Sequence, residues 1–148
     1  MLNTNISVKG SLKILVYGSD GLIKDKREFN NLVVSTGLGF IASRMKDTTD
    51  DVMSYMAIGT GTTASAAGDT SLQTELDRKS LISTSVSSNV ITYFASWNAG
   101  EGTGAITEAG IFNAASGGTM LARTVFDVVN KSEDESLAVL WSITISAG

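Results

Sequence analysis

Apolar residues occupy every second position near the end of the chain, and this period of two is the feature that most constrains the fold. Leu137, Val139, Trp141, Ile143 and Ile145 alternate with residues that are mostly small or polar. Successive side chains of a β-strand point to opposite faces, whereas the apolar stripe of an α-helix repeats about every 3.6 residues. The pattern therefore predicts a strand with one face in a core.

Apolar runs separated by turn signals fill most of the remaining chain. Asp20-Gly21, for example, is a pair typical of tight hairpins. The predicted strands cover residues 12–17, 22–29 with a short continuation at 32–34, 53–58, 81–86, 90–97, 106–112, 120–128 and 137–145. About eight strands joined by turns favour a mainly β fold, an antiparallel β-sandwich of jelly-roll type. The charged middle of 22–29 indicates an edge strand, because charges there discourage pairing with other chains.

One short α-helix is predicted after residue 34. Ser35 or Thr36 offers an N-cap oxygen, and the acidic cluster at 47–51 ends the helix. Its apolar stripe is expected to consist of residues at helical spacing, namely Leu38, Ile41, Ala42 and Met45. A single helical turn is expected at 71–76. The composition does not change enough along the chain to divide it, so residues 11–148 are expected to form one domain, preceded by an N-terminal arm at 1–10.

Two residue types are missing, and their absence narrows the possible chemistry. The 148 residues include no histidine and no cysteine. A Ser-His-Asp triad, an imidazole metal ligand, a thiolate site and a disulfide are thereby excluded. We therefore expect a protein that is not an enzyme, with no catalytic residue, no metal site and no cofactor.

Charge and hydropathy exclude two classes of partner. The formal net charge is -4, with 11 Lys and Arg against 15 Asp and Glu, whereas nucleic-acid binding depends on cationic contacts. No apolar run approaches the roughly 20 residues that span a bilayer, and the first ten residues lack the apolar segment of a signal peptide. We expect no nucleic acid and no membrane as partner, and folding in a cytoplasm.

Lone charges in apolar strands point to ion pairs. Glu108 and Arg123 each lie between small uncharged residues in a predicted strand, and a buried charge requires a partner. The sequence predicts a partly buried ion pair, either Glu108 with Arg123 or Glu75 with Arg78. Gly59-Thr60-Gly61 lacks the Gly-Lys-Ser/Thr ending of a phosphate-binding loop, so it is expected to be a turn.

Aromatic and acidic residues leave two weaker alternatives. Trp97 and Trp141 lie in predicted strands, where core packing is the ordinary role of a tryptophan. Exposed instead, they would suit a carbohydrate-binding module or a hydrolase. Tyr55 is a candidate for contact with a partner, since tyrosine is enriched at interfaces. The aspartates of 47–51 are expected to be solvated rather than to bind Ca²⁺, because their spacing does not match an EF-hand.

The order of several motifs resembles that of small structural proteins of tailed-bacteriophage particles. The matching segments are Asn31–Val34 leading into Gly37 and Ile41-Ala42, Met56–Thr63, Leu72–Leu76 with Arg78, Ile106–Asn113, Met120–Phe126 and Trp141–Ile145. The resemblance covers roughly residues 30 to 145. It implies a virion structural protein, made in the cytoplasm of a host bacterium and located in the virion.

Within that family, we expect a capsid decoration (cement) protein that binds the major capsid protein and stabilises the shell. It is also expected to pair with itself, as a dimer or trimer. A tail-fibre or tail adaptor component is the alternative, and a carbohydrate-binding module is the alternative of another class. The expected contact residues lie in the arm and in the loop that follows residue 59, with one aromatic residue: Asn3, Thr4, Asn5, Ile6, Ser7, Val8, Thr60, Thr62, Thr63 and Tyr55.

Overall fold

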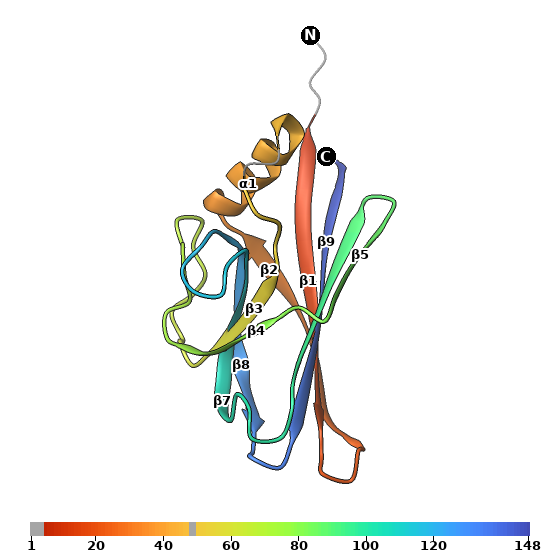
Figure 1. Cartoon of the computed structure of the whole chain (residues 1–148), viewed down its shortest axis with the longest axis vertical. Helices are drawn as coiled ribbons and strands as arrows, with labels where there is room; N and C mark the ends of the chain where they lie inside the picture. The colour runs from red at the N-terminus through yellow and green to blue at the C-terminus, as the bar shows by residue number, and fades with distance from the viewer. Residues whose placement is uncertain (1–4, 48–49) are drawn as a thin grey trace.

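Nine antiparallel strands and one helix make up the part of the chain that the structure, a computed structural model, describes: residues 5–47 and 50–148. Figure 1 shows their arrangement. The strands are β1 (Ile6–Tyr17), β2 (Ile23–Val33), β3 (Tyr55–Gly59), β4 (Glu75–Ser80), β5 (Ser83–Ser87), β6 (Val90–Trp97), β7 (Gly104–Phe112), β8 (Met120–Lys131) and β9 (Ser136–Ala147), and the helix is α1 (Ser35–Lys46). The predicted mainly β, antiparallel fold with one helix is confirmed.

All nine strands belong to one hydrogen-bonded sheet, in the order β4-β3-β7-β8-β2-β1-β9-β6-β5. Strand β2 joins the two halves of the sheet, because its two ends pair with different neighbours. Its residues from Ile23 to Asn31 pair with β1, whereas Leu32 and Val33 pair with β8. The expected jelly-roll sandwich of two sheets is therefore corrected to one curled sheet, which continues through the end of β2.

A short connection between the two outermost strands requires this sheet to curl. The two outermost strands, β4 and β5, are separated by only Leu81 and Ile82. The amide of Leu81 donates to the carbonyl oxygen of Ser54, and the amide of Ile82 donates to that of Phe94. A two-residue connection spans less than about 10 Å, so the two edges of a nine-stranded sheet can lie this close only if the sheet bends round.

The core fills the inside of the bend, and its side chains come from both halves of the sheet. The alternation predicted for the last strand is confirmed up to Ile143, which is 1% exposed, whereas Ile145 is 37% exposed. The largest apolar side chains that are fully buried are Trp97, Trp141, Phe112, Leu12, Ile14, Met56, Ile58, Ile106, Ile111 and Met120. Burial of such side chains is the main stabilising term of the fold.

The helix lies where the sequence predicted it, but the face that packs on the sheet shares only Ile41 with the predicted stripe. Its buried residues are Gly37 and Phe40, whereas Leu38 and Met45 of the expected stripe are 47% and 86% exposed. A Cβ on Gly37 would lie 2.0 Å from the carbonyl oxygen of Leu121, so a glycine is required for helix and strand to approach this closely. The expected side-chain cap is also absent, since Val34 occupies the N-cap position.

Three further predictions are corrected by the strand pairing. Residues 6–10 are not a free arm: they begin β1 and pair with the end of β9, from Ile6 opposite Ala147 onward. Residues 71–76 form no helical turn, and β4 begins at Glu75. The charged segment of β2 lies inside the sheet order, although its residues pair with β1 alone, so it has an open side like an edge strand.

Candidate functional site

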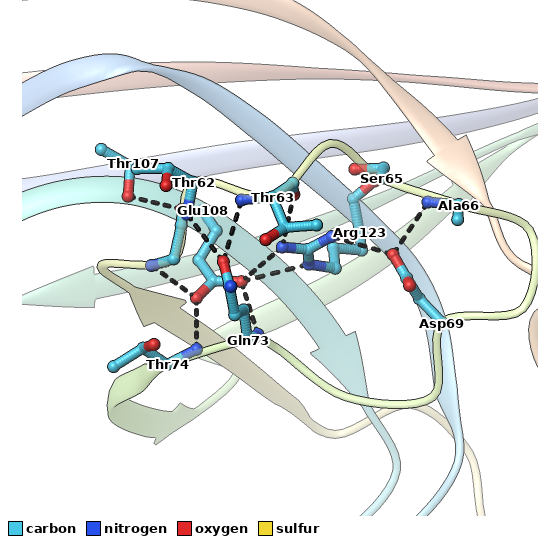
Figure 2. Close-up of polar contacts among 11 residues, drawn as sticks. Thr62, Thr63, Ser65, Ala66, Asp69, Gln73, Thr74, Thr107, Glu108 and Arg123 are labelled. Atoms are coloured by element: carbon cyan, nitrogen blue, oxygen red, sulfur yellow. Dashed lines mark hydrogen bonds and ion pairs between the residues drawn. The ribbon is translucent and has the colours of Figure 1, made fainter.

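A carboxylate and a guanidinium meet inside the molecule beneath the loop at 60–74 (Figure 2). Glu108 comes from β7 and is 0% exposed, and Arg123 comes from the neighbouring strand β8 and is 2% exposed. The Nε and Nη2 atoms of Arg123 donate to Oε1 of Glu108, at 3.1 and 3.0 Å. These are the two residues for which the sequence predicted an ion pair.

The backbone of the overlying loop supplies the rest of the Glu108 environment. The amides of Gly61 and Thr74 donate to Oε2 at 2.8 and 2.7 Å, and the amide of Gln73 donates to Oε1 at 2.8 Å. One carboxylate thus receives three amide hydrogen bonds in addition to the two from Arg123. Both ends of the loop are held to β7 through a single side chain.

Arg123 connects the same pair to the middle of the loop. Its Nη1 atom donates to Oδ2 of Asp69 at 2.8 Å, and its Nη2 atom also donates to the carbonyl oxygen of Thr63 at 3.0 Å. Asp69 accepts a further hydrogen bond from the amide of Ala66. The arginine therefore bridges two carboxylates, one fully buried and one partly exposed at the loop surface.

Side-chain and backbone contacts within the loop complete the cluster. The Oε1 atom of Gln73 accepts from the amides of Thr62 and Thr63, at 2.9 and 2.8 Å, and the hydroxyl of Thr107 donates to the carbonyl oxygen of Gly61. A Cβ on Gly61 would lie 2.3 Å from Oε2 of Glu108. Only a glycine lets the backbone come this close.

The electrostatics keep Glu108 ionised. Burial raises the pKa of its carboxyl, but the amide hydrogen bonds from Thr74 and Gln73, with those from Arg123 and Gly61, outweigh burial. The net shift of the Glu108 pKa is downward. This is the arrangement of a charged structural clamp, since the carboxylate is directed at the loop backbone and at Arg123 rather than at an open surface.

The cluster also explains the two glycines at 59 and 61, where a Cβ would lie 2.7 and 2.3 Å from Oε2 of Glu108. The Gly61 amide donates inward to a carboxylate rather than outward to a ligand. The turn predicted at 59–61 is not formed, since Gly59 ends β3 and the chain runs on as a loop. The exposed residues Thr60, Thr62 and Thr63 lie on this loop, which buried contacts hold in place. A fixed loop presents the same surface to a partner at little entropic cost.

A second ion pair fixes a second loop. Arg78 donates from Nη2 to Oε1 of Glu75 at 2.6 Å, and from Nη1 to the carbonyl oxygens of Ala114 and Gly117. Its guanidinium lies 3.7 Å from the centre of the Phe112 ring. This pair, also predicted from the sequence, holds the connection between β7 and β8.

A groove lies where β1 and β2 separate. The pairing of the two strands stops at Gly10 opposite Asn31, and the last residues of β2 turn toward β8. The space between them is about 700 Å³ and is lined by the first turn of α1 as well as by both strands. Its apolar lining includes Ile6, which is 68% exposed, with Leu32 and Leu38.

Polar groups without partners also line this groove. The β1–β2 register ends at Gly10 opposite Asn31, and the pair that would follow, Lys9 with Leu32, is not formed. Both polar side-chain atoms of Asn31 are buried and make no hydrogen bond within the described part of the chain. Such groups are costly unless something satisfies them. The groove therefore has apolar walls, and the carboxamide of Asn31 is buried at its closed end, beside Gly10.

The residues expected to contact a partner are thus divided among several places. Ile6 and Val8 line the groove, Asn5 and Ser7 are their neighbours at the start of the sheet, and Tyr55 is half-buried against a small core cluster around Phe112. Asn3 and Thr4 lie outside the described residues. The sequence did not assign a role to Asp69 or Gln73, because polar side chains in loops carry no periodic signal, nor to Asn31, whose position depends on where β1 and β2 separate.

Other ligand classes find little support in the described residues. Within 5–47 and 50–148, no three acidic residues gather in a way that could hold a metal ion. None of the ten aromatic side chains is fully exposed, and Trp97 and Trp141 are both 0% exposed. The described part of the chain also contains no helix long and apolar enough to cross a membrane.

Comparison of the chain with protein-family models, with curated proteins and with solved structures gave no match.

Proposed function

We propose that this chain is a structural protein of a tailed-phage virion, and specifically a decoration protein that binds the major capsid protein and stabilises the shell. The observation that carries the proposal is the groove between β1 and β2, with its exposed Ile6 and its apolar walls. The motif order from Asn31 to Ile145 supports the choice of a virion protein.

The chemistry of the groove suits an extended segment of a capsid subunit. A strand entering it would place alternate apolar side chains against Ile6 and Leu32, and its peptide groups would meet the open edges of β1 and β2. A protein that binds the assembled shell and not its free subunits stabilises that shell by linkage.

The rest of the molecule fits a role as a rigid adaptor. The Glu108 and Arg78 clusters fix the loops at 60–74 and 113–119, and the curled sheet buries a continuous core. Little of the described chain has to become ordered when a partner binds. The exposed threonines Thr60, Thr62 and Thr63 then form a second surface that can touch a neighbouring subunit.

Co-sedimentation tests this proposal. The full chain is mixed with shells assembled from the major capsid protein of the same phage, and the bound fraction is measured against concentration. Ile6→Asp places a charge in the groove and removes an apolar contact worth about 1.5–3 kcal/mol, so binding should weaken roughly tenfold or more. No binding by the unmodified chain would contradict the proposal.

Leu22→Asp is the matched control. Leu22 is as exposed as Ile6, at 68%, but it lies in the turn between β1 and β2, about 35 Å along the strand from the groove. This variant should bind shells like the unmodified protein. Equal loss in both variants would point to a general effect of charge and would overturn the role of the groove.

Copy number distinguishes the shell from the tail. A decoration protein is present in hundreds of copies per particle, whereas a tail-fibre or tail adaptor component is present in a dozen or fewer. Quantitative mass spectrometry of purified particles against the major capsid protein gives this ratio. A low ratio would move the protein to the tail and leave its role as a virion structural protein intact.

A further inference from the structure

The two edges of the sheet differ sharply in charge. The edge strand β4 has four charged residues among its six, Glu75, Asp77, Arg78 and Lys79. The other edge strand, β5, has the sequence Ser-Thr-Ser-Val-Ser and no charge at all. Charges, prolines and bulges are the usual means of preventing an edge strand from pairing with another chain. β4 has charges for this purpose, whereas β5 has neither a charge nor a proline.

β5 is also fully accessible. All five of its residues are exposed, and it pairs on one side only, with β6. Figure 1 shows this hairpin at the flank of the molecule, with no element beyond it. An antiparallel ladder directs the backbone N–H and C=O groups of alternate residues to opposite sides of a strand. Half of the backbone groups of β5 therefore face outward without a strand to receive them.

Exposed apolar side chains accompany this open edge. Val86 is 70% exposed and Ile82, just before the strand, is 61% exposed. Val86 lies opposite Ile91 of β6, which in turn lies opposite the buried Ile143 of β9. The inner, apolar face of the sheet thus continues outward to β5 without being covered there.

We propose that β5 pairs with β5 of a second copy of this chain, in an antiparallel dimer with two-fold symmetry. Identical chains of net charge -4 repel one another, so an uncharged edge is the part of the sheet where they can meet at the least electrostatic cost. A strand that pairs with itself antiparallel satisfies both open edges at once and closes the assembly. The exposed Val86 side chains would be covered by the same contact.

The symmetry singles out the middle of the strand. Ser85 is the central residue of the five, so a two-fold axis through the centre of the interface places the two Ser85 residues opposite each other. Of the dimer and the trimer expected from the sequence, this pairing gives the dimer. It does not depend on shell binding: a monomer that still bound shells would overturn this proposal alone.

Sedimentation velocity from about 1 to about 500 µM is the first test. The unmodified chain should shift from monomer to dimer across this range, and Ser85→Lys should remain a monomer, because it gives β5 the edge charge that it lacks. The matched control is Ser80→Lys at the exposed end of β4, which should dimerise like the unmodified chain. Thermal unfolding of each variant verifies that it is folded.

Disulfide trapping gives a second, independent readout, because the chain contains no cysteine of its own. Under mild oxidation Ser85→Cys should form a covalent dimer at low concentration, whereas Ser80→Cys should not. An unmodified chain that is monomeric throughout, or a dimer that Ser85→Lys leaves intact, would overturn the proposal. Equal crosslinking of both cysteine variants would overturn it as well.

Discussion

The Arg123 guanidinium donates two hydrogen bonds to one oxygen of Glu108, while its third nitrogen reaches Asp69 at 2.8 Å. Through these contacts two residues of adjacent strands hold a loop whose residues lie 34 to 60 positions away in the chain. The pair is buried, so its effect on stability depends on the whole network being complete.

Breaking this pair on one side should cost more than removing it altogether. Glu108→Gln or Arg123→Met alone leaves a buried charge without its main partner, and each should lower the free energy of unfolding by about 3–5 kcal/mol. The double variant should lose less than either single variant, because no buried charge is then left without its partner. Urea denaturation of all four proteins gives the coupling free energy, and additive losses would show that the two side chains do not act as a unit.

The sequence predicted this pair because single charges in apolar strands require partners, and the strand order then brought β7 and β8 together. The alternation of Leu137 through Ile143 likewise predicted the last strand, since a period of two is the repeat of a strand with one buried face. These features depend on local pattern alone. Arg123 could therefore be predicted as the partner of Glu108 without knowing where the loop at 60–74 lies.

The remaining features depend on contacts that are distant in sequence. β4 was not predicted, because a strand with four charges in six residues has no apolar alternation. The predicted buried face of α1 was right for Ile41 but wrong for Leu38 and Met45, because the close approach at Gly37 rotates the helix toward Phe40. Asn31 could not be identified as a groove residue, because the groove exists only where β1 and β2 separate.

Gly61→Ala should destabilise the protein by about 1–3 kcal/mol, because the added methyl group would overlap the Glu108 carboxylate and the side chain of Gln73. Gly68→Ala in the same loop is the control, since a Cβ there meets no atom within 4 Å. It should be neutral or slightly stabilising. Thermal unfolding compares the two, and an equal loss would mean that the loop tolerates no side chain at either position.

The Lys24–Glu135 ion pair should make stability depend on pH in the acid range. Nζ of Lys24 lies 2.5 Å from Oε2 of Glu135, and the hydrogen bond from Lys24, with those from Ser132, lowers the pKa of Glu135 from 4.5 to about 2. A depressed carboxyl pKa adds stability above the unfolded-state value, and this stability is lost as the pH falls from about 4.5 to about 2.

Glu135→Gln separates this contribution from general acid unfolding. The difference in urea midpoint between the unmodified protein and the variant should be largest near neutral pH and should shrink as the pH approaches about 2. A difference that stays constant from about pH 7 to about pH 2.5 would show that the Glu135 carboxyl does not titrate with a lowered pKa.

The fluorescence of the two tryptophans should be that of buried side chains and not of a sugar-binding surface. Trp97 and Trp141 are 0% exposed, and their indole N–H groups have no hydrogen-bond partner among the described residues. Their fluorescence should therefore be blue-shifted relative to free tryptophan and weakly quenched by acrylamide, and both properties should change together on unfolding. A glycan array should give no binding, because no fully exposed aromatic ring is present on the described surface to stack on a sugar. Efficient quenching in the folded protein, relieved by an added oligosaccharide, would favour a carbohydrate-binding module over a structural protein of the virion.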